Sequence, residues 1–274
     1  MYLLKNKNSL FNLNSGIRVS NGLSYRKRII IMVTGTNVEP YDKNWKECYS
    51  TWIPELKKLG YTVLVSLANP NIENYFELSE DKETIYFKTS EYKDGLFFKS
   101  IYFPIKWVLE NTNYDYYLRV DSDSFLEPYR FDNMFRENLE TISNIDYMGC
   151  CHPHINWNPH LTFRKIIYKP RHFASGCAYF VSRYAMQIAY KTMRVEAQGD
   201  LAIDDWVLGR AMWENGIPLI HDSRILFESK YKQLSADPFE IGMPDIAQPA
   251  SHLAIQHYMH GHMEDAMLKL GYRN

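Results

Sequence analysis

The sequence lacks several features that would place it in a class at once. It has no apolar run long enough for a signal peptide or a membrane anchor, and residues 1–25 are polar and rich in Asn, Ser and Lys. Lys plus Arg total 31 and Asp plus Glu total 32, so the chain shows no charge excess of the kind that nucleic-acid binding requires. Its four cysteines have no CxxC spacing for zinc. We expect a soluble cytoplasmic protein with reduced thiols that neither spans a membrane nor binds nucleic acid.

Aromatic residues are abundant instead, with 21 Tyr, 14 Phe and 6 Trp in 274 residues. Such side chains suit a core, but they also suit the faces of sugars and bases. We find no internal repeat and no linker, and this length can form one large domain. We therefore expect a polar N-terminal extension, residues 1–25, followed by a single domain, residues 26–274. The sequence does not indicate the oligomeric state.

Apolar runs bounded by turn residues alternate with amphipathic stretches through the first 125 residues. Such runs are typical of strands that are covered on both faces. We expect strands at 29–33, 61–68, 84–88 and 116–120. They are separated by a helical pattern at 44–60, which Pro54 does not fit, and by a helix at 96–112 bent at Pro104. Strands alternating with helices imply a mostly parallel α/β sheet.

The second half is less regular. Its Pro-rich stretch 235–252 has the composition of a loop or lid. The other elements that we expect are strands at 147–152, 217–222, 224–229 and 253–262, helices at 183–193 and from Asp204 or Asp205 to Gly216, and a short helix ending at Leu270.

Polar residues end two of the expected strands. Thr34-Gly35-Thr36 follows the first, and Asp121-Ser122-Asp123 follows the strand 116–120. Parallel sheets bind ligands at the carboxyl ends of their strands, so these segments are expected to share one crevice. If the strand geometry persists, Asp121 and Asp123 point to the same side and need a cation or protons. Oxygen ligands suit Mg²⁺ or Mn²⁺ bound to a diphosphate, although a turn or capping role explains an isolated Asp-x-Asp equally well.

Two further constellations have a functional and a structural interpretation. Asp204 and Asp205 open a helix, where they either bind a ligand or cap the helix. Four histidines lie near the end of the chain, and they either supply nitrogen ligands to the same metal ion or are ordinary polar residues. They are His252, His257, His260 and His262.

Taken in order, these blocks resemble the fringe-like, β1,3-galactosyltransferase-like glycosyltransferases with a GT-A fold. The matching segments are "YYLRVDSDSFL", "ASGCAYFVS", "IDDWVLG" and "YMHGHMEDAM", with "YKDGLFFKS" similar to an earlier block of the family; together they lie between residues 28 and 270. The resemblance implies a nucleotide-diphospho-sugar transferase fold with a mostly parallel central sheet flanked by helices. It also implies a nucleotide-binding half, residues 26–125, and an acceptor-binding half, residues 126–274, with a smaller acceptor-side sheet.

The resemblance also implies roles for single residues. Asp123 is expected to bind Mn²⁺ or Mg²⁺ directly with support from Asp121, and His260 or His257 is expected to complete the metal site. Asp205 aligns with the family's general base, and Asp204 would orient the sugar or the acceptor. The residues expected to contact the UDP-sugar are Thr34, Gly35, Thr36, Lys99, Ser122 and Gly176, and Trp157, Trp206 and Trp213 are candidates for stacking on sugars.

The implied reaction moves a sugar, either galactose, N-acetylglucosamine, glucose or xylose, from UDP to a hydroxyl of a glycan acceptor, with inversion. The chain lacks the Golgi anchor of eukaryotic members, which fits a bacterial relative or a viral protein in a host cytoplasm; a Golgi-type chain trimmed of its anchor is the alternative. Two rival functions remain. "VDSDSFL" also resembles the nucleophile motif of haloacid-dehalogenase-like phosphatases, and the same fold can serve as a non-catalytic nucleotide-sugar-binding module.

Overall fold

The computed structural model of the chain describes residues 25–91, 93–141, 145–151, 173–193, 204–222, 225–226, 254–256 and 261–272. Within them, one eight-stranded sheet runs through the molecule and a small three-stranded sheet lies beside it. None of the described helices is both long and apolar enough to cross a membrane. Cys48, Cys150 and Cys177 form no disulfide.

The large sheet is mostly parallel. Its strands, in spatial order, are β3 (Phe76–Leu78), β4 (Thr84–Phe87), β2 (Thr62–Ala68), β1 (Ile29–Thr34), β5 (Tyr116–Asp121), β8 (Ala174–Ser182), β7 (Tyr147–Cys151) and β9 (Ile220–His221). The central strands β4, β2, β1 and β5 pair in parallel, whereas β3 and β8 run in the opposite direction to their neighbours. This is the α/β sheet that the alternating pattern of the first 125 residues predicts.

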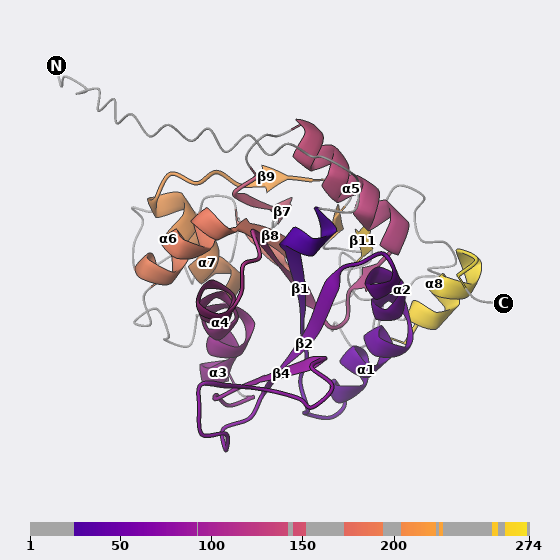
Figure 1. The fold of residues 1–274 in the computed structure, drawn as a ribbon, viewed down its shortest axis with the longest axis horizontal. Helices are drawn as coiled ribbons and strands as arrows, with labels where there is room; N and C mark the ends of the chain where they lie inside the picture. The colour runs from indigo at the N-terminus through magenta and orange to yellow at the C-terminus, as the bar shows by residue number, and fades with distance from the viewer. Residues whose placement is uncertain are drawn as a thin grey trace, which may run out of the picture.

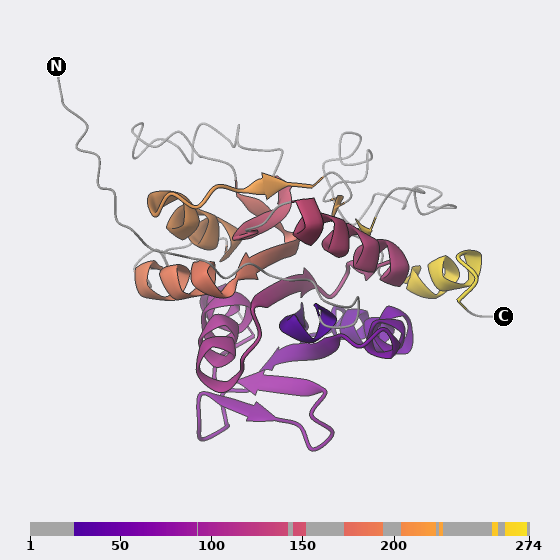
Figure 2. The same cartoon turned by 45° about the horizontal axis from the view of Figure 1, so that its top comes forward.

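Helices cover both faces of this sheet (Figures 1 and 2). The residues of β1 show why its sequence is apolar throughout: Ile29, Ile31 and Val33 join the core on one face, and Ile30 and Met32 join the core on the other. The first face is covered by α1 (Asp42–Ser50), α2 (Trp52–Lys58), α5 (Pro128–Thr141) and α8 (Met263–Lys269), and the second by α4 (Phe103–Asn111), α6 (Arg183–Thr192) and α7 (Asp204–Glu214).

The expected helix 44–60 is two helices. It breaks at Thr51, and α2 restarts at Trp52 with Pro54 in its first turn. Pro54 has no N–H to donate to the carbonyl of Ser50, and its ring would collide with that carbonyl in a continuous helix. The sequence marked Pro54 as the exception to this helical pattern, and the structure places the break three residues before it, at Thr51.

The expected helix 96–112 begins earlier and is interrupted. It consists of α3 (Lys93–Phe97), a π-helical turn over Phe98–Tyr102, and α4, with Pro104 at the start of α4. Pro104 cannot donate to the carbonyl of Ser100, and the hydroxyl of Tyr117 donates to that oxygen instead at 3.0 Å. The irregularity at the proline is therefore a π turn.

In the second half of the chain, the described helices and strands lie where the sequence predicts them, but the strands are shorter. The helix expected at 183–193 is α6, capped by the Ser182 side chain, which accepts a bond from the Ala185 N–H. The expected strands 217–222, 224–229 and 253–262 are shorter, with β9 at Ile220–His221, β10 at Ile225–Leu226 and β11 at Ile255–Gln256. The stretch 235–252 lies outside the described residues.

The small sheet joins the end of the chain to the middle of it. In it β11 pairs with β10 and, antiparallel, with β6 (Phe125–Leu126). Gln256 lies opposite Phe125, and Phe125 follows Asp123 by two residues in the sequence. The resemblance implied a second, smaller sheet, and the structure contains one directly after the aspartate turn.

Candidate active site

The two polar strand ends lie side by side, as the sequence predicts. β1 and β5 pair in parallel with Thr34 opposite Asp121. β8 is antiparallel to β5, so its beginning, at Ala174–Gly176, reaches the same edge of the sheet. Segments that are far apart in the chain therefore meet at the carboxyl ends of the central strands.

The aspartates of the Asp121-Ser122-Asp123 turn are not two steps of one strand. β5 ends at Asp121, and the Ser124 N–H donates to the Asp121 carbonyl at 3.0 Å, which closes a turn. The two-residue alternation that would place both carboxylates on one side therefore stops at Asp121. Ser122 is buried, whereas Asp121 and Asp123 are partly exposed at the edge of the sheet.

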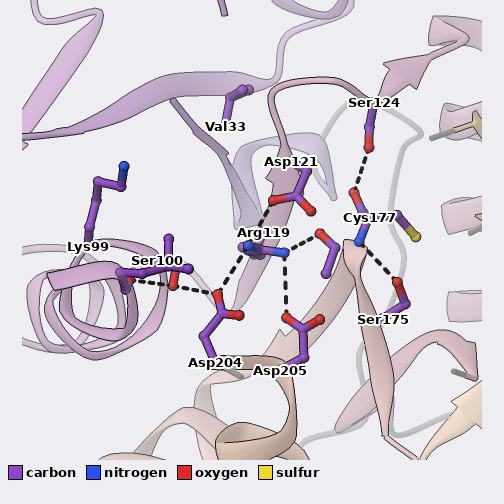
Figure 3. A network of polar contacts seen from close by, with 12 residues as sticks. Val33, Lys99, Ser100, Arg119, Asp121, Ser124, Ser175, Cys177, Asp204 and Asp205 are labelled. Atoms are coloured by element: carbon purple, nitrogen blue, oxygen red, sulfur yellow. Dashed lines mark hydrogen bonds and ion pairs between the residues drawn. The ribbon is translucent and has the colours of Figure 1, made fainter. Parts of the chain in front are cut away.

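A buried arginine lies at the centre of the site (Figure 3). Arg119, on β5, has an exposed side-chain fraction of 4% and places its Nη2 2.8 Å from Asp121 Oδ1 and 3.2 Å from Asp204 Oδ2. Its Nη1 donates to the Gly176 carbonyl and lies 3.6 Å from Asp205 Oδ1. One guanidinium thus faces three carboxylates from two elements. The sequence interpretation missed Arg119, although the two-residue period of β5 puts it on the same side as Asp121.

Asp204 and Asp205 form the first turn of α7 and are both buried. Asp204 is held on two sides, because the Ser100 hydroxyl donates to its Oδ2 at 2.6 Å and Arg119 donates to the same oxygen. Asp205 Oδ1, by contrast, has no hydrogen-bond partner among the described residues. The two neighbouring carboxylates therefore differ: Asp204 Oδ2 accepts two hydrogen bonds, whereas Asp205 Oδ1 has only the longer ion-pair contact with Arg119.

Burial raises the pKa of Asp205 well above its usual range, and the charge of Asp204 raises it further. Arg119 opposes this shift without abolishing it. Burial acts to lower the pKa of Arg119, but the attraction of Asp121 and Asp204 outweighs it and raises that pKa. Asp205 thus has the higher proton affinity that a general base needs in a water-poor site.

Gly176 lies where no side chain fits. A Cβ added there would lie 2.8 Å from Asp205 Oδ2 and would also collide with the Arg119 guanidinium. The glycine therefore lets β8 approach the charged cluster closely. The structure explains this residue by its neighbours, and its contact with a donor sugar stays a prediction.

Lys99 is buried rather than solvated. Its ammonium donates to the Gly35 carbonyl at 2.8 Å and forms an ion pair with Glu91. Glu91 Oε1 in turn accepts from the N–H groups of Asn37 and Ala68, which follow β1 and end β2. The pair ties these strand ends to the helix that carries Lys99, so direct binding of phosphate by Lys99 stays a prediction.

The other residues expected at the nucleotide lie at the end of β1. Thr34 is buried with an Oγ1 that has no partner among the described residues. A Cβ at Gly35 would lie about 3 Å from Leu67, Trp45 and Val65. The Thr36 hydroxyl accepts from the Val38 N–H, and the Thr36 carbonyl accepts from Trp45 Nε1.

Only part of the expected metal site falls within the described residues. His252, His257 and His260 lie outside them, as does Trp157, and in the described part of the chain no three His, Cys, Asp or Glu side chains are grouped to hold a metal. The donors at hand are the carboxylates of Asp121 and Asp123, which are of the type that Mg²⁺ and Mn²⁺ prefer. Trp206 and Trp213 are half-buried on α7, and Arg210 lies over the Trp206 ring.

Two features separate the chain from the phosphatase alternative. The aspartate turn follows β5 rather than the first strand, and the Asp204–Asp205 pair opens α7 rather than ending a strand. A phosphatase of that family would place its nucleophile after the first strand.

Comparison with solved structures gives weak similarities to sugar transferases. A glycosyltransferase involved in glycosylation of the major capsid of PBCV-1 is 13% identical, with 71% of this chain and 81% of that chain covered and a TM-score of 0.44. The galactosyltransferase LgtC, solved with donor and acceptor sugar analogues, is 12% identical (84% and 86% covered, TM-score 0.49). A mannosyltransferase from Pyrobaculum calidifontis, solved with GDP-Man and Mn²⁺, is 12% identical (75% and 57% covered, TM-score 0.42). No curated protein sequence gives a significant match.

The family model for Galactosyltransferase matches residues 80–223, which are 144 of the 274 residues and more than half of the chain. The matched region contains β5 with its aspartate turn, β8 with Gly176 and the acidic start of α7. The mostly parallel central sheet flanked by helices that the resemblance implied is confirmed, and the chain is a glycosyltransferase that belongs to the galactosyltransferase family.

Proposed function

We propose that the chain transfers a sugar from a UDP-sugar to a hydroxyl of a glycan acceptor, with inversion and with a divalent metal ion at Asp121 and Asp123. The candidate sugars are galactose, N-acetylglucosamine, glucose and xylose. The observation that carries the proposal is the cluster around Arg119, in which Asp121, Asp204 and Asp205 meet beside Gly176 at the carboxyl edge of the sheet. We also propose that residues 26–274 form one catalytic domain, with residues 26–125 on the nucleotide side.

The carboxylates fit a hard divalent cation. When Asp121, Asp204 and Asp205 are all ionised, their charge exceeds that of Arg119, so a cation at this edge is electrostatically favoured. Asp123 and Asp121 would hold the ion, and such an ion stabilises the negative charge that develops on the departing diphosphate. Mn²⁺ and Mg²⁺ both suit these oxygen donors.

The two ends of the stretch 257–260 support a histidine ligand. Gln256 pairs beside Phe125, and Gly261 donates its N–H to Glu47 on α1, whose neighbour Cys48 contacts the aspartate turn. Both flanks of the stretch that contains His257 and His260 are therefore anchored close to Asp121-Ser122-Asp123. This supports the proposal that one of these histidines joins the metal site.

Asp205 is the proposed general base. An acceptor hydroxyl must lose a proton as it attacks, and the base must have sufficient proton affinity and an oxygen that can accept that proton. Asp205 Oδ1 is unpartnered among the described residues, and the pKa of this carboxyl is raised by burial and by Asp204. Asp204, fixed by Ser100 and Arg119, would orient the acceptor or the sugar.

Thermal unfolding with a panel of nucleotide sugars, with and without Mn²⁺, tests the donor and metal. A ligand at a hundredfold excess over its Kd stabilises the folded state by about 2.7 kcal/mol. We expect a Mn²⁺-dependent rise in Tm with one UDP-sugar, and its loss in Asp123→Ala.

Asp115→Ala is the matched control, because Asp115 precedes the opposite end of β5 and pairs with Arg28. It should keep the ligand-induced rise. If no nucleotide sugar raises the Tm of the wild type in the presence of Mn²⁺, the proposed donor site is wrong. If donor turns over but Asp123→Ala binds and reacts like the wild type, the proposed role of Asp123 is wrong.

A further inference from the structure

Helix α1 contacts both the aspartate turn and the last helix, which are about 140 residues apart in sequence. It carries Glu47 and Cys48 next to each other. Glu47 reaches the residues that begin α8, and Cys48 reaches the turn that follows β5. Neither residue belongs to any motif that the sequence singled out.

Glu47 binds the backbone at the start of α8 with both of its carboxylate oxygens. Oε2 accepts from the Gly261 N–H at 2.5 Å, and Oε1 accepts from the Met263 N–H at 2.9 Å. The first N–H groups of a helix have no partner inside the helix, and their positive end favours a carboxylate. The bidentate contact therefore fixes the position of the chain where it enters α8.

Cys48 is fully buried and contacts both segments. Its Sγ donates at 3.1 Å to the Ser122 carbonyl, which belongs to the peptide bond between Ser122 and Asp123, and the same Sγ lies 3.9 Å from Met263 Sδ. Thr51 Oγ1 also lies 3.9 Å from Met263 Sδ. Met263 is fully buried, so the start of α8 and the aspartate turn are packed against the same side of α1.

We propose that Glu47 and Cys48 are positioning residues for the metal site, because they fix the Asp121-Ser122-Asp123 turn relative to the chain at Gly261. The inference rests on the proposed metal-dependent function. Groups that hold ligands in place without touching the ion change metal affinity by about 10- to 100-fold when they are altered. Glu47 binds the Met263 N–H and Met263 Sδ lies 3.9 Å from Cys48 Sγ, so the bonds at the start of α8 and the bond to the Ser122 carbonyl belong to one packed group of residues.

The test is a titration of Mn²⁺ in the presence of UDP, followed by the loss of the electron paramagnetic resonance signal of free Mn²⁺. Glu47→Gln keeps the shape of the side chain but has one acceptor oxygen for two N–H groups. We expect its Mn²⁺ affinity to fall by about tenfold or more. Asp42→Asn on the same helix, which removes an exposed pair with Lys46, should bind Mn²⁺ like the wild type.

A second pair of variants keeps the test decisive if Glu47→Gln folds poorly. Cys48→Ala removes the donor to the Ser122 carbonyl, whereas Cys48→Ser keeps a hydroxyl donor at that place. We expect weaker Mn²⁺ binding in Cys48→Ala and partial recovery in Cys48→Ser, with thermal unfolding of both recorded to confirm that they are folded.

The outcomes separate this inference from the proposed function. Wild-type binding with a loss in Glu47→Gln and Cys48→Ala supports the positioning role. Wild-type binding that is unchanged in both variants overturns the positioning role and leaves the metal site standing. A wild type that binds no Mn²⁺ with UDP overturns both.

Discussion

Lys99 and Arg119 are both buried cations at the carboxyl edge of the sheet, and they lie in opposite electrostatic surroundings. Lys99 pairs with Glu91, and Glu91 is further satisfied by the backbone N–H groups of Asn37 and Ala68. Arg119 faces three carboxylates, and one of them, Asp205, has an oxygen without a hydrogen-bond partner among the described residues.

This difference indicates a structural role for the Lys99–Glu91 pair and a reactive role for the Arg119 cluster. A buried pair that is balanced and hydrogen-bonded holds the backbone in place and leaves no uncompensated charge. A cluster with excess negative charge costs folding free energy, and a bound cation or substrate recovers that cost. The Lys99–Glu91 pair therefore holds the ends of β1 and β2 in place, and the Arg119 cluster carries the proposed reaction.

Removal of Arg119 should have the largest effect. Arg119→Ala leaves three carboxylates close together without their shared cation, and breaking a buried pair in this way costs about 3–5 kcal/mol of stability. Arg119→Lys keeps the charge but lacks the fork that reaches both the carboxylates and the Gly176 carbonyl, so it should recover part of the stability and little of the activity. Urea unfolding and donor turnover measure the two effects. An Arg119→Ala variant as stable as the wild type would show that Arg119 does not offset the repulsion among the three carboxylates.

Removal of Lys99 should lower the stability by less, and a second substitution at its partner Glu91 should recover part of the loss. Lys99→Met leaves Glu91 with its two N–H donors but without its cation, and we expect a loss of about 2 kcal/mol. The double variant Lys99→Met/Glu91→Gln should recover part of that loss, because the pair is removed together. If Lys99→Met instead keeps full stability and loses UDP binding, Lys99 contacts the nucleotide directly and its main role is not to hold the strand ends.

Asp205→Asn should change stability in the opposite direction. The folded-state pKa of Asp205 is raised, so as pH rises the unfolded state loses this proton first and the wild type is destabilised until the pH passes the folded-state pKa. A folded-state pKa that lies one pH unit above the unfolded-state pKa costs about 1.4 kcal/mol of stability once the carboxyl is ionised in both states, and Asn carries no such cost. We expect Asp205→Asn to gain stability relative to the wild type as pH rises from about 4, the unfolded-state pKa of an aspartate, and urea unfolding from about pH 4 upward measures this gain. A stability difference that is constant over this range would show that Asp205 is not destabilised by its burial.

The parts of the fold that are encoded locally were predicted from the sequence. The four parallel strands follow from apolar runs, and the meeting of Thr34 with Asp121 follows from the geometry of parallel strands. The break at Thr51 was also encoded, because Pro54 removes a bond to Ser50; the sequence marked this proline as the exception to the helical pattern but did not place the break.

The contacts that complete the site could not be predicted from the sequence in the same way. Arg119 lies in an apolar strand, and only its two-residue spacing from Asp121 hinted that it faces the aspartates. The contact of Glu47 with Met263 joins residues more than 200 positions apart, and no local pattern marks either one. Such contacts depend on how whole elements pack, so the sequence indicated which residues are reactive but not which residues hold them.

The most direct test of the central claim is the release of UDP from a UDP-sugar in the presence of Mn²⁺, compared between the wild type, Asp205→Asn and Asp115→Asn. Loss of a general base lowers turnover by about 10²- to 10⁴-fold, while the donor, bound through Asp121 and Asp123, should still raise the Tm of Asp205→Asn. Asp115→Asn, at the other end of the strand, should turn over like the wild type. If Asp205→Asn releases UDP as fast as the wild type, the buried carboxylate beside Arg119 is not the base, and the account of this edge as the reactive site is wrong.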